Sequence, residues 1–174
     1  LNVITRMEVQ GTLGKDDVWR VKANGPTFDG RDFFRSLFSL GQLAEQQPKA
    51  KNPREGIDLE AEIGTVIGFS EVALRGVKLK LAKRGERLTV LDARGTLDGG
   101  KPLAVVLRQD PGQPRKLLAD STDAGQAFKL TDFYPNIQGG RVRLEVNLDG
   151  KGAAEKTGIL WVEEFRILGD RGER

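Results

Sequence analysis

The reactive side chains of this sequence are chiefly carboxylates, because its 174 residues include neither histidine nor cysteine. That composition removes thiolate nucleophiles, disulfides, the usual structural zinc sites and the commonest general base. Two carboxylates alone can hydrolyse a glycosidic bond. Glu163 with Glu164, and Asp120 with Asp123, are close enough in sequence to consider, but such pairs are common among 25 acidic residues. No catalytic residue is therefore predicted.

Other common activities find equally little support. The net charge of +3, from 28 basic and 25 acidic residues, is too small to indicate a nucleic-acid partner. The glycine-rich turns lack the phosphate-binding lysine pattern and the dinucleotide fingerprint, so no cofactor and no metal site is predicted. The sequence has no apolar run of ~20 residues and no signal-peptide pattern at its start. We expect a fragment of a longer protein whose anchor or export signal lies elsewhere.

Alternation of apolar and polar residues predicts that strands dominate, since a period of two places one set of side chains on one face. The clearest example alternates Val142, Leu144, Val146 and Leu148 with polar residues. Turn signals separate the alternating segments at residues 14–17, 83–86, 98–101 and 149–152. The expected strands are residues 4–9, 18–23, 57–63, 72–81, 88–97, 103–108, 142–148 and 159–167.

The alternation changes phase inside two of these strands. In the first, Val72 and Leu74 have one parity, Val77 has the other, and Gly76 lies at the change. The second change follows Val90. A phase change of this kind predicts a β-bulge, which bends and twists a sheet. We therefore expect a mainly β domain spanning residues 1–174, with a long, curved antiparallel sheet that forms a groove or half-barrel.

Two segments have helical spacing and are expected to cover or plug the sheet as amphipathic lids. The first follows Asp29 or Asp32 as a possible cap and ends before Pro48; the second covers residues 122–133 and precedes Pro135. Residues 46–55 are expected to form an exposed, mobile connection. The expected apolar stripes are Phe33, Phe34, Leu37, Phe38, Gly41 and Ala44 in the first helix, and Ala124, Ala127, Phe128 and Thr131 in the second.

One stretch of sequence is more specific than these patterns. Residues 121–128, STDAGQAF, lead through an aromatic turn into residues 133–144, FYPNIQGGRVRL. This helix, turn, Gly-Gly and strand resembles the C-terminal AsmA-like region of the YhdP/TamB-type bacterial envelope proteins. Residues 25–34, 95–99 and 158–167 resemble flanking parts of that family.

The resemblance implies an inner-membrane-anchored protein that extends through the periplasm. It also implies a β-sheet groove that carries phospholipid acyl chains toward the outer membrane. The candidate groove residues could instead form a closed core under the helices, and both interpretations stay open. These candidates are Leu103, Val105, Leu107, Val142, Leu144, Val146 and Leu148.

A short basic cluster is a second candidate site. Lys78, Lys80, Lys83 and Arg84 could contact anionic lipid headgroups. The ordinary interpretation is a solvated strand face, where lysine discourages edge pairing.

Three functions remain open from the sequence. The first is a non-enzymatic periplasmic module that binds phospholipid and supports outer-membrane lipid homeostasis. The second is a structural module that stacks through its sheet edges on envelope proteins without holding lipid. The carboxylate glycosidase is the third, and it would need two acids converging in a polar cleft.

Overall fold

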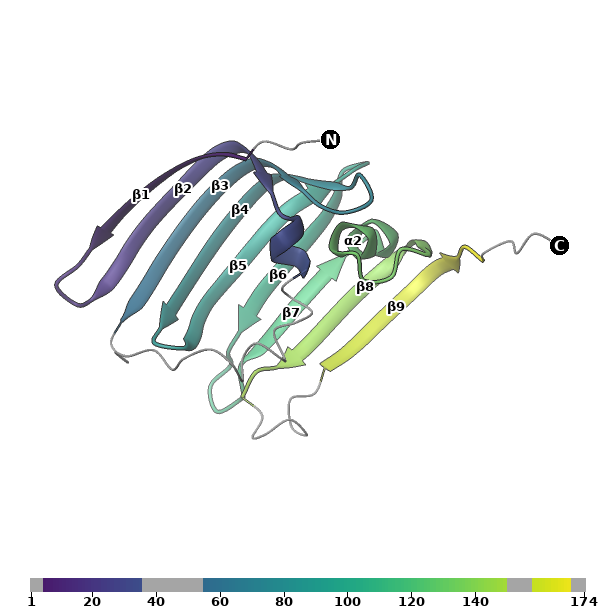
Figure 1. Ribbon diagram of the computed structural model, residues 1–174. Coiled ribbons are helices and arrows are strands. Elements are labelled where there is room, and N and C mark those ends of the chain that lie inside the picture. Colours follow the sequence, from purple (N-terminus) through teal and green to yellow (C-terminus); the bar gives the residue numbers. More distant parts are fainter. Residues whose placement is uncertain (1–4, 36–54, 150–157, 170–174) are drawn as a thin grey trace.

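The computed structural model describes residues 5–35, 55–149 and 158–169, and in these ranges nine strands form one open, curved sheet (Figure 1). The strands lie in the order in which they occur in the chain. This mainly β architecture with two helical segments confirms the expected fold class. The strands are β1 (Arg6–Leu13), β2 (Val18–Asp29), β3 (Gly56–Ile67), β4 (Ala73–Arg84), β5 (Arg87–Leu97), β6 (Lys101–Arg108), β7 (Lys116–Ser121), β8 (Ile137–Asn147) and β9 (Gly158–Ile167).

The sheet is mixed, so the fully antiparallel sheet expected from the sequence is wrong at one pair. β2 and β3 run parallel, whereas the other neighbouring strands pair antiparallel. A parallel pair needs a crossover of a dozen or more residues. Residues 30–55 provide that length, and the helical segment at residues 31–35 lies within this connection.

One strand was not expected at all. β7 contains Leu117, Leu118 and Ala119 in succession, so its sequence does not alternate between apolar and polar residues. Leu117 pairs with Leu107 and Val146, whereas Leu118 points to the opposite face of the sheet. A strand that places apolar residues on both faces loses the period-two signal.

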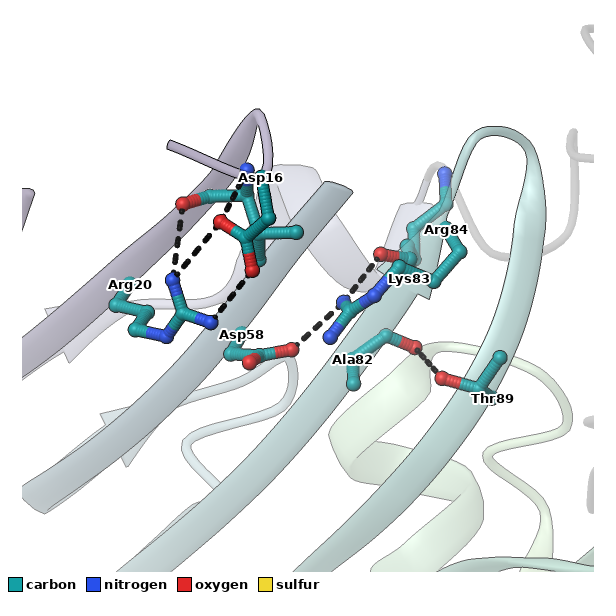
Figure 2. A network of polar contacts seen from close by, with 8 residues as sticks. Asp16, Arg20, Asp58, Ala82, Lys83, Arg84 and Thr89 are labelled. Carbon is teal, nitrogen blue, oxygen red and sulfur yellow. Dashed lines mark hydrogen bonds and ion pairs between the residues drawn. The ribbon is translucent and has the colours of Figure 1, made fainter. Parts of the chain in front are cut away.

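The first expected phase change coincides with a bulge, whereas the second bulge lies at Thr89, before Val90 and not after it, so that Leu88 and Val90 face opposite sides of the sheet. The β4–β5 register shifts between Arg75 and Lys78, and Gly76 has a positive φ of 60°. A second shift leaves Thr89 as an extra residue in β5, and its Oγ1 donates a hydrogen bond to the carbonyl oxygen of Ala82 at 3.2 Å (Figure 2). Bulges increase the local twist of a sheet, in agreement with the observed curvature.

Helix α2 (Ala124–Thr131) confirms the second expected helix, with slightly shorter bounds. The Asp123 carboxylate caps it by accepting a hydrogen bond from the Gln126 amide at 3.0 Å. The helix ends where Asp132 adopts the left-handed conformation. Thr131 is half-buried, whereas Leu130, absent from the expected stripe, is fully buried.

α2 covers one end of the sheet, which curves around it (Figure 1). The side chain of Gln126 accepts a hydrogen bond from the Asp98 amide at 3.0 Å and donates one to the Asp98 carbonyl at 2.9 Å, in the β5–β6 turn. The Leu130 carbonyl accepts a hydrogen bond from the Phe69 amide, between β3 and β4. The hydrophobic core is thus concentrated at this end, in a cluster of Phe34, Val66, Val72, Val77, Leu97, Ala124, Ala127, Phe128, Leu130, Ile137 and Val142.

The first expected helix is confirmed over residues 31–35. Phe34 is buried in the core, but Phe33 is 56% exposed, so its expected place in the apolar stripe is wrong. Of the two possible caps, Asp29 accepts the Arg31 amide at 3.1 Å. The remaining stripe residues, Leu37, Phe38, Gly41 and Ala44, lie outside the described residues, as does the expected mobile connection except for Glu55.

Candidate functional site

The apolar residues of the sheet line up across the strands in rows. Residues that pair across neighbouring strands point to the same face, so the register assigns each side chain to a face. We call the side that α2 covers the apolar face. We number the rows of this face from the outer row, which lies farthest from α2, to the fourth row, which lies nearest to it. The third row crosses all nine strands through Val9, Ala23, Ala61, Leu79, Ala93, Val105, Ala119, Leu144 and Leu160.

Three further rows run beside this one on the apolar face. The outer row lies farthest from α2 and contains Leu13, Trp19, Ile57, Lys83 and Leu88. The second row contains Gly11, Val21, Leu59, Leu81, Leu91, Leu107, Leu117 and Val146. The fourth row, nearest α2, contains Gly25, Ile63, Val77, Gly95, Leu103, Ser121, Val142 and Val162.

Burial differs along the apolar face. In the fourth row, Val77 and Val142 belong to the helix-covered core, and Ile63, Leu103 and Val162 pack against it. Most side chains in the second and third rows are only half-buried, including Leu59, Leu81 and Leu107, and Val9 and Leu160 at the two sheet edges are exposed. Folding thus leaves an extensive aliphatic surface partly accessible beyond the helix-covered end.

The opposite side, which we call the charged face, carries ion pairs. Lys22, Glu60, Lys80 and Asp92 form one cross-strand line of alternating charge. Figure 2 shows the neighbouring pairs, in which Arg20 donates to Asp16 at 2.9 Å and Arg84 donates to Asp58 at 2.7 Å.

These ion pairs lower the pKa values of the acidic side chains. The Arg20 guanidinium holds the pKa of the Asp16 carboxyl at about 2, and Arg84 lowers the pKa of Asp58, in both cases chiefly by hydrogen bonding to the carboxylate. Both acids are therefore ionised at neutral pH. The sheet is amphipathic, with charges on one face and aliphatic rows on the other.

The structure brings six of the seven predicted groove residues together on the apolar face. Leu103 and Val142 lie in the fourth row against the helix-covered core, whereas Val105, Leu107, Leu144 and Val146 lie in the half-buried rows. Leu148 follows the end of β8, and its amide donates to the Arg115 carbonyl at 2.9 Å.

Sequence reasoning missed the contribution of the N-terminal strands to the same face. Leu59, Leu79 and Leu81 continue the rows, and their alternation was visible in the sequence. The sequence did not show how the strands that contain these residues pair with the rest of the sheet.

The predicted basic cluster does not gather in one place. Lys78 and Lys80 lie on the charged face opposite Glu62 and Glu60, and Arg84 is paired with Asp58 on that face. Lys83 has the other parity, so it lies in the outer row of the apolar face. The interpretation as a solvated strand face fits Lys78 and Lys80, but not Lys83.

A buried arginine joins strand ends far from α2. Arg115, 8% exposed, donates from Nε and Nη2 to Asp149 Oδ1 at 2.9 and 2.7 Å, and from Nη1 to the Leu88 carbonyl. The Arg115 amide also donates to Asp149 Oδ2 at 2.7 Å. These bonds tie the beginnings of β5 and β7 to the chain beyond β8, so the sheet is held together at the end that lacks α2.

This ion pair predicts a pH-dependent stability. Arg115 lowers the pKa of Asp149 from 3.8 to about 2, so the ionised carboxylate stabilises the fold above pH 3.8, and this contribution disappears as the pH falls toward 2. We expect wild type to have a higher melting temperature than Asp149→Asn at neutral pH, with the difference shrinking in acid. Thermal melts of both proteins between about pH 7 and pH 2 measure it; a difference independent of pH would contradict the assignment.

In the structure, three of the four acidic residues considered as catalytic pairs lie beside arginine residues or at a helix terminus. Glu163 lies opposite Arg141 and Asp120 opposite Arg143 in the sheet, and Asp123 caps α2. Glu164 adopts a positive φ of 55° in β9. In the described ranges, no three acidic side chains are grouped so that they could hold a metal ion.

Two open cavities lie away from the predicted groove residues. One, of about 490 Å³, is next to the C-terminal end of α2 and is lined by Arg35, Phe69, Thr131, Asp132 and Phe133. The other, of about 310 Å³, lies between β1 and β2 and is lined by residues 6–8 and 24–26. The candidate surface is the half-buried face itself.

Comparison with known proteins finds no match among family models, curated proteins or solved structures. Among the residues that the structure describes, no helix has both the length and the apolar character needed to cross a membrane.

Proposed function

We propose that this chain is a non-enzymatic lipid-binding module whose apolar face holds phospholipid acyl chains. The observation that carries the proposal is the third row, which crosses nine strands without a charged side chain, from Val9 at one edge to Leu160 at the other. The opposite face bears ion pairs and is suited to water. An acyl chain needs only such a dry surface and no reactive group.

The energetics support an acyl ligand. Each methylene removed from water contributes ~0.8 kcal/mol, so an acyl chain gains several kcal/mol even on an open surface. Half-buried residues such as Leu59, Leu81 and Leu107 would lose their remaining contact with water when a chain lies on them. α2 occupies one end of this face and would limit how far the acyl chain reaches.

The cellular setting in this proposal comes from the family resemblance. By that resemblance, the module acts in the periplasm as part of an inner-membrane-anchored protein and supports outer-membrane lipid homeostasis. Its contact with the membrane would then be made by other parts of the longer protein.

A structural role is the second candidate function, and the sheet edges favour it. Within the described residues, β1 and β9 each pair on one side only. β9 also presents exposed apolar residues, among them Ile159, Phe165 and Ile167. An unpaired edge can accept a strand from an envelope partner.

Native mass spectrometry of the purified chain, followed by solvent extraction, separates the two functions. The lipid-binding module should carry phospholipid at a defined stoichiometry, or take it up from added fluorescent phospholipid. A ligand-free mass together with no uptake would leave the structural role as the better explanation.

A matched pair of variants tests whether the apolar face is the binding surface. Leu79→Asn places an amide in the third row, whereas Lys80→Asn makes the same new residue on the charged face of the same strand. We expect Leu79→Asn to weaken uptake of fluorescent phospholipid about tenfold, because lipid must then cover an unpaired polar group. Lys80→Asn should bind like wild type. Equal binding by both variants would contradict the proposal, and circular dichroism verifies that both remain folded.

A further inference from the structure

Lys83 occupies an unusual position on the apolar face. It is half-buried in the outer row, where its β3 neighbour is Ile57 and its β5 neighbour is Leu88. The second and third rows, between Lys83 and the helix-covered end, contain no charged residue. A cation therefore lies at one end of an aliphatic surface, on the side remote from α2.

The Lys83 ammonium is available for a ligand. Nearby Arg84 is paired with Asp58, and Arg115 is paired with Asp149. Lys83 forms no ion pair with any residue in the described part of the chain. Trp19 lies in the same row and is 45% exposed, and its indole suits a boundary between apolar and polar surroundings.

From this arrangement we propose that the apolar face binds anionic phospholipid in one orientation, with the phosphate at Lys83 and the acyl chains directed toward α2. The inference rests on the proposed lipid-binding function and adds the ligand's charge and direction. An anionic headgroup complements an unpaired lysine, and the opposite orientation would place the phosphate against the buried core around Leu97 and Leu130.

The length of the surface agrees with this orientation. Along β4, the distance from Lys83 to Leu79 is about 13 Å and from Lys83 to Val77 about 20 Å, at about 3.3 Å per residue. One leaflet contributes about half of the ~30 Å hydrocarbon thickness of a bilayer. An acyl chain that starts at Lys83 would thus cross the second and third rows and end near the residues that α2 covers.

The test compares two fluorescent phospholipids with identical acyl chains, phosphatidylglycerol and phosphatidylcholine, titrated into the whole chain. Wild type should bind the anionic lipid about fivefold more tightly than the zwitterionic one. Lys83→Gln should remove that preference, because it should weaken the binding of phosphatidylglycerol more than that of phosphatidylcholine, whose choline cation already neutralises the phosphate. The matched control, Lys80→Gln, loses the same charge from the charged face of the same strand and should keep the preference.

The possible results separate this inference from the proposed function. If wild type binds both lipids equally, or if Lys83→Gln retains the preference, the headgroup site is wrong although lipid binding stands. Equal loss of preference in both lysine variants would indicate a general charge effect and would also overturn the site. If wild type binds neither lipid, the proposed function fails together with the inference.

Discussion

Replacing Leu130 with alanine is expected to lower the free energy of unfolding by about 2–5 kcal/mol. Leu130 is 0% exposed and lies so close to Gly68 that a Cβ atom on Gly68 would fall 2.4 Å from Leu130 Cδ1. The truncated side chain would leave a cavity between α2 and the β3–β4 connection. Urea denaturation followed by circular dichroism measures the loss.

The control for this experiment has the same chemistry at an exposed position. Leu13→Ala removes the same atoms from the end of β1, where the side chain is 53% exposed. Leu13→Ala should lower the free energy of unfolding by well under half as much as Leu130→Ala does, because little apolar area returns to water. Similar losses in the two variants would mean that α2 is not an integral part of the folded core.

Replacing Arg115 with alanine is expected to cost about 2–3 kcal/mol of stability. The guanidinium is buried and bonds both Asp149 and the Leu88 carbonyl, so its removal takes two hydrogen bonds from the carboxylate and one from the carbonyl. The Asp149 carboxylate would keep the bond from the backbone amide of residue 115. The urea midpoint should fall while the m-value stays constant.

Arg20→Ala provides the comparison for this substitution. The Arg20–Asp16 pair is half-exposed on the charged face, and exposed pairs contribute little to stability. Its removal should hardly move the urea midpoint. If Arg20→Ala and Arg115→Ala had equal effects, burial of Arg115 would not be the source of its importance.

The sequence was informative wherever a local pattern decides the structure. Period-two alternation placed Val142, Leu144 and Val146 on one face, and the phase change at Gly76 predicted the bulge that the register contains. Asp123 and the residues after it specified α2 through capping and helical spacing. These features depend on residues close together in the chain, so a single sequence reveals them.

The features that were missed depend on long-range pairing. Nothing near Arg115 indicates its bond to Asp149, which lies 34 residues away in sequence. The complete burial of Leu130 depends on its place over Gly68, a residue of another connection. The parity of Lys83 could have separated it from Lys78 and Lys80, but the extent of the apolar rows beside it required the register of β3, β4 and β5.

The strand order has a consequence for how the chain folds. Apart from the β2–β3 pair, neighbouring strands pair antiparallel with the strand that follows in the chain, although α2 lies between β7 and β8, and such local contacts favour rapid folding because little loop entropy is lost. The parallel β2–β3 pair must close the connection of residues 30–55. We infer that this is the entropically costliest of the pairing steps, so β1 and β2 join as a hairpin to a sheet already begun at β3, and the apolar rows reach their full width last.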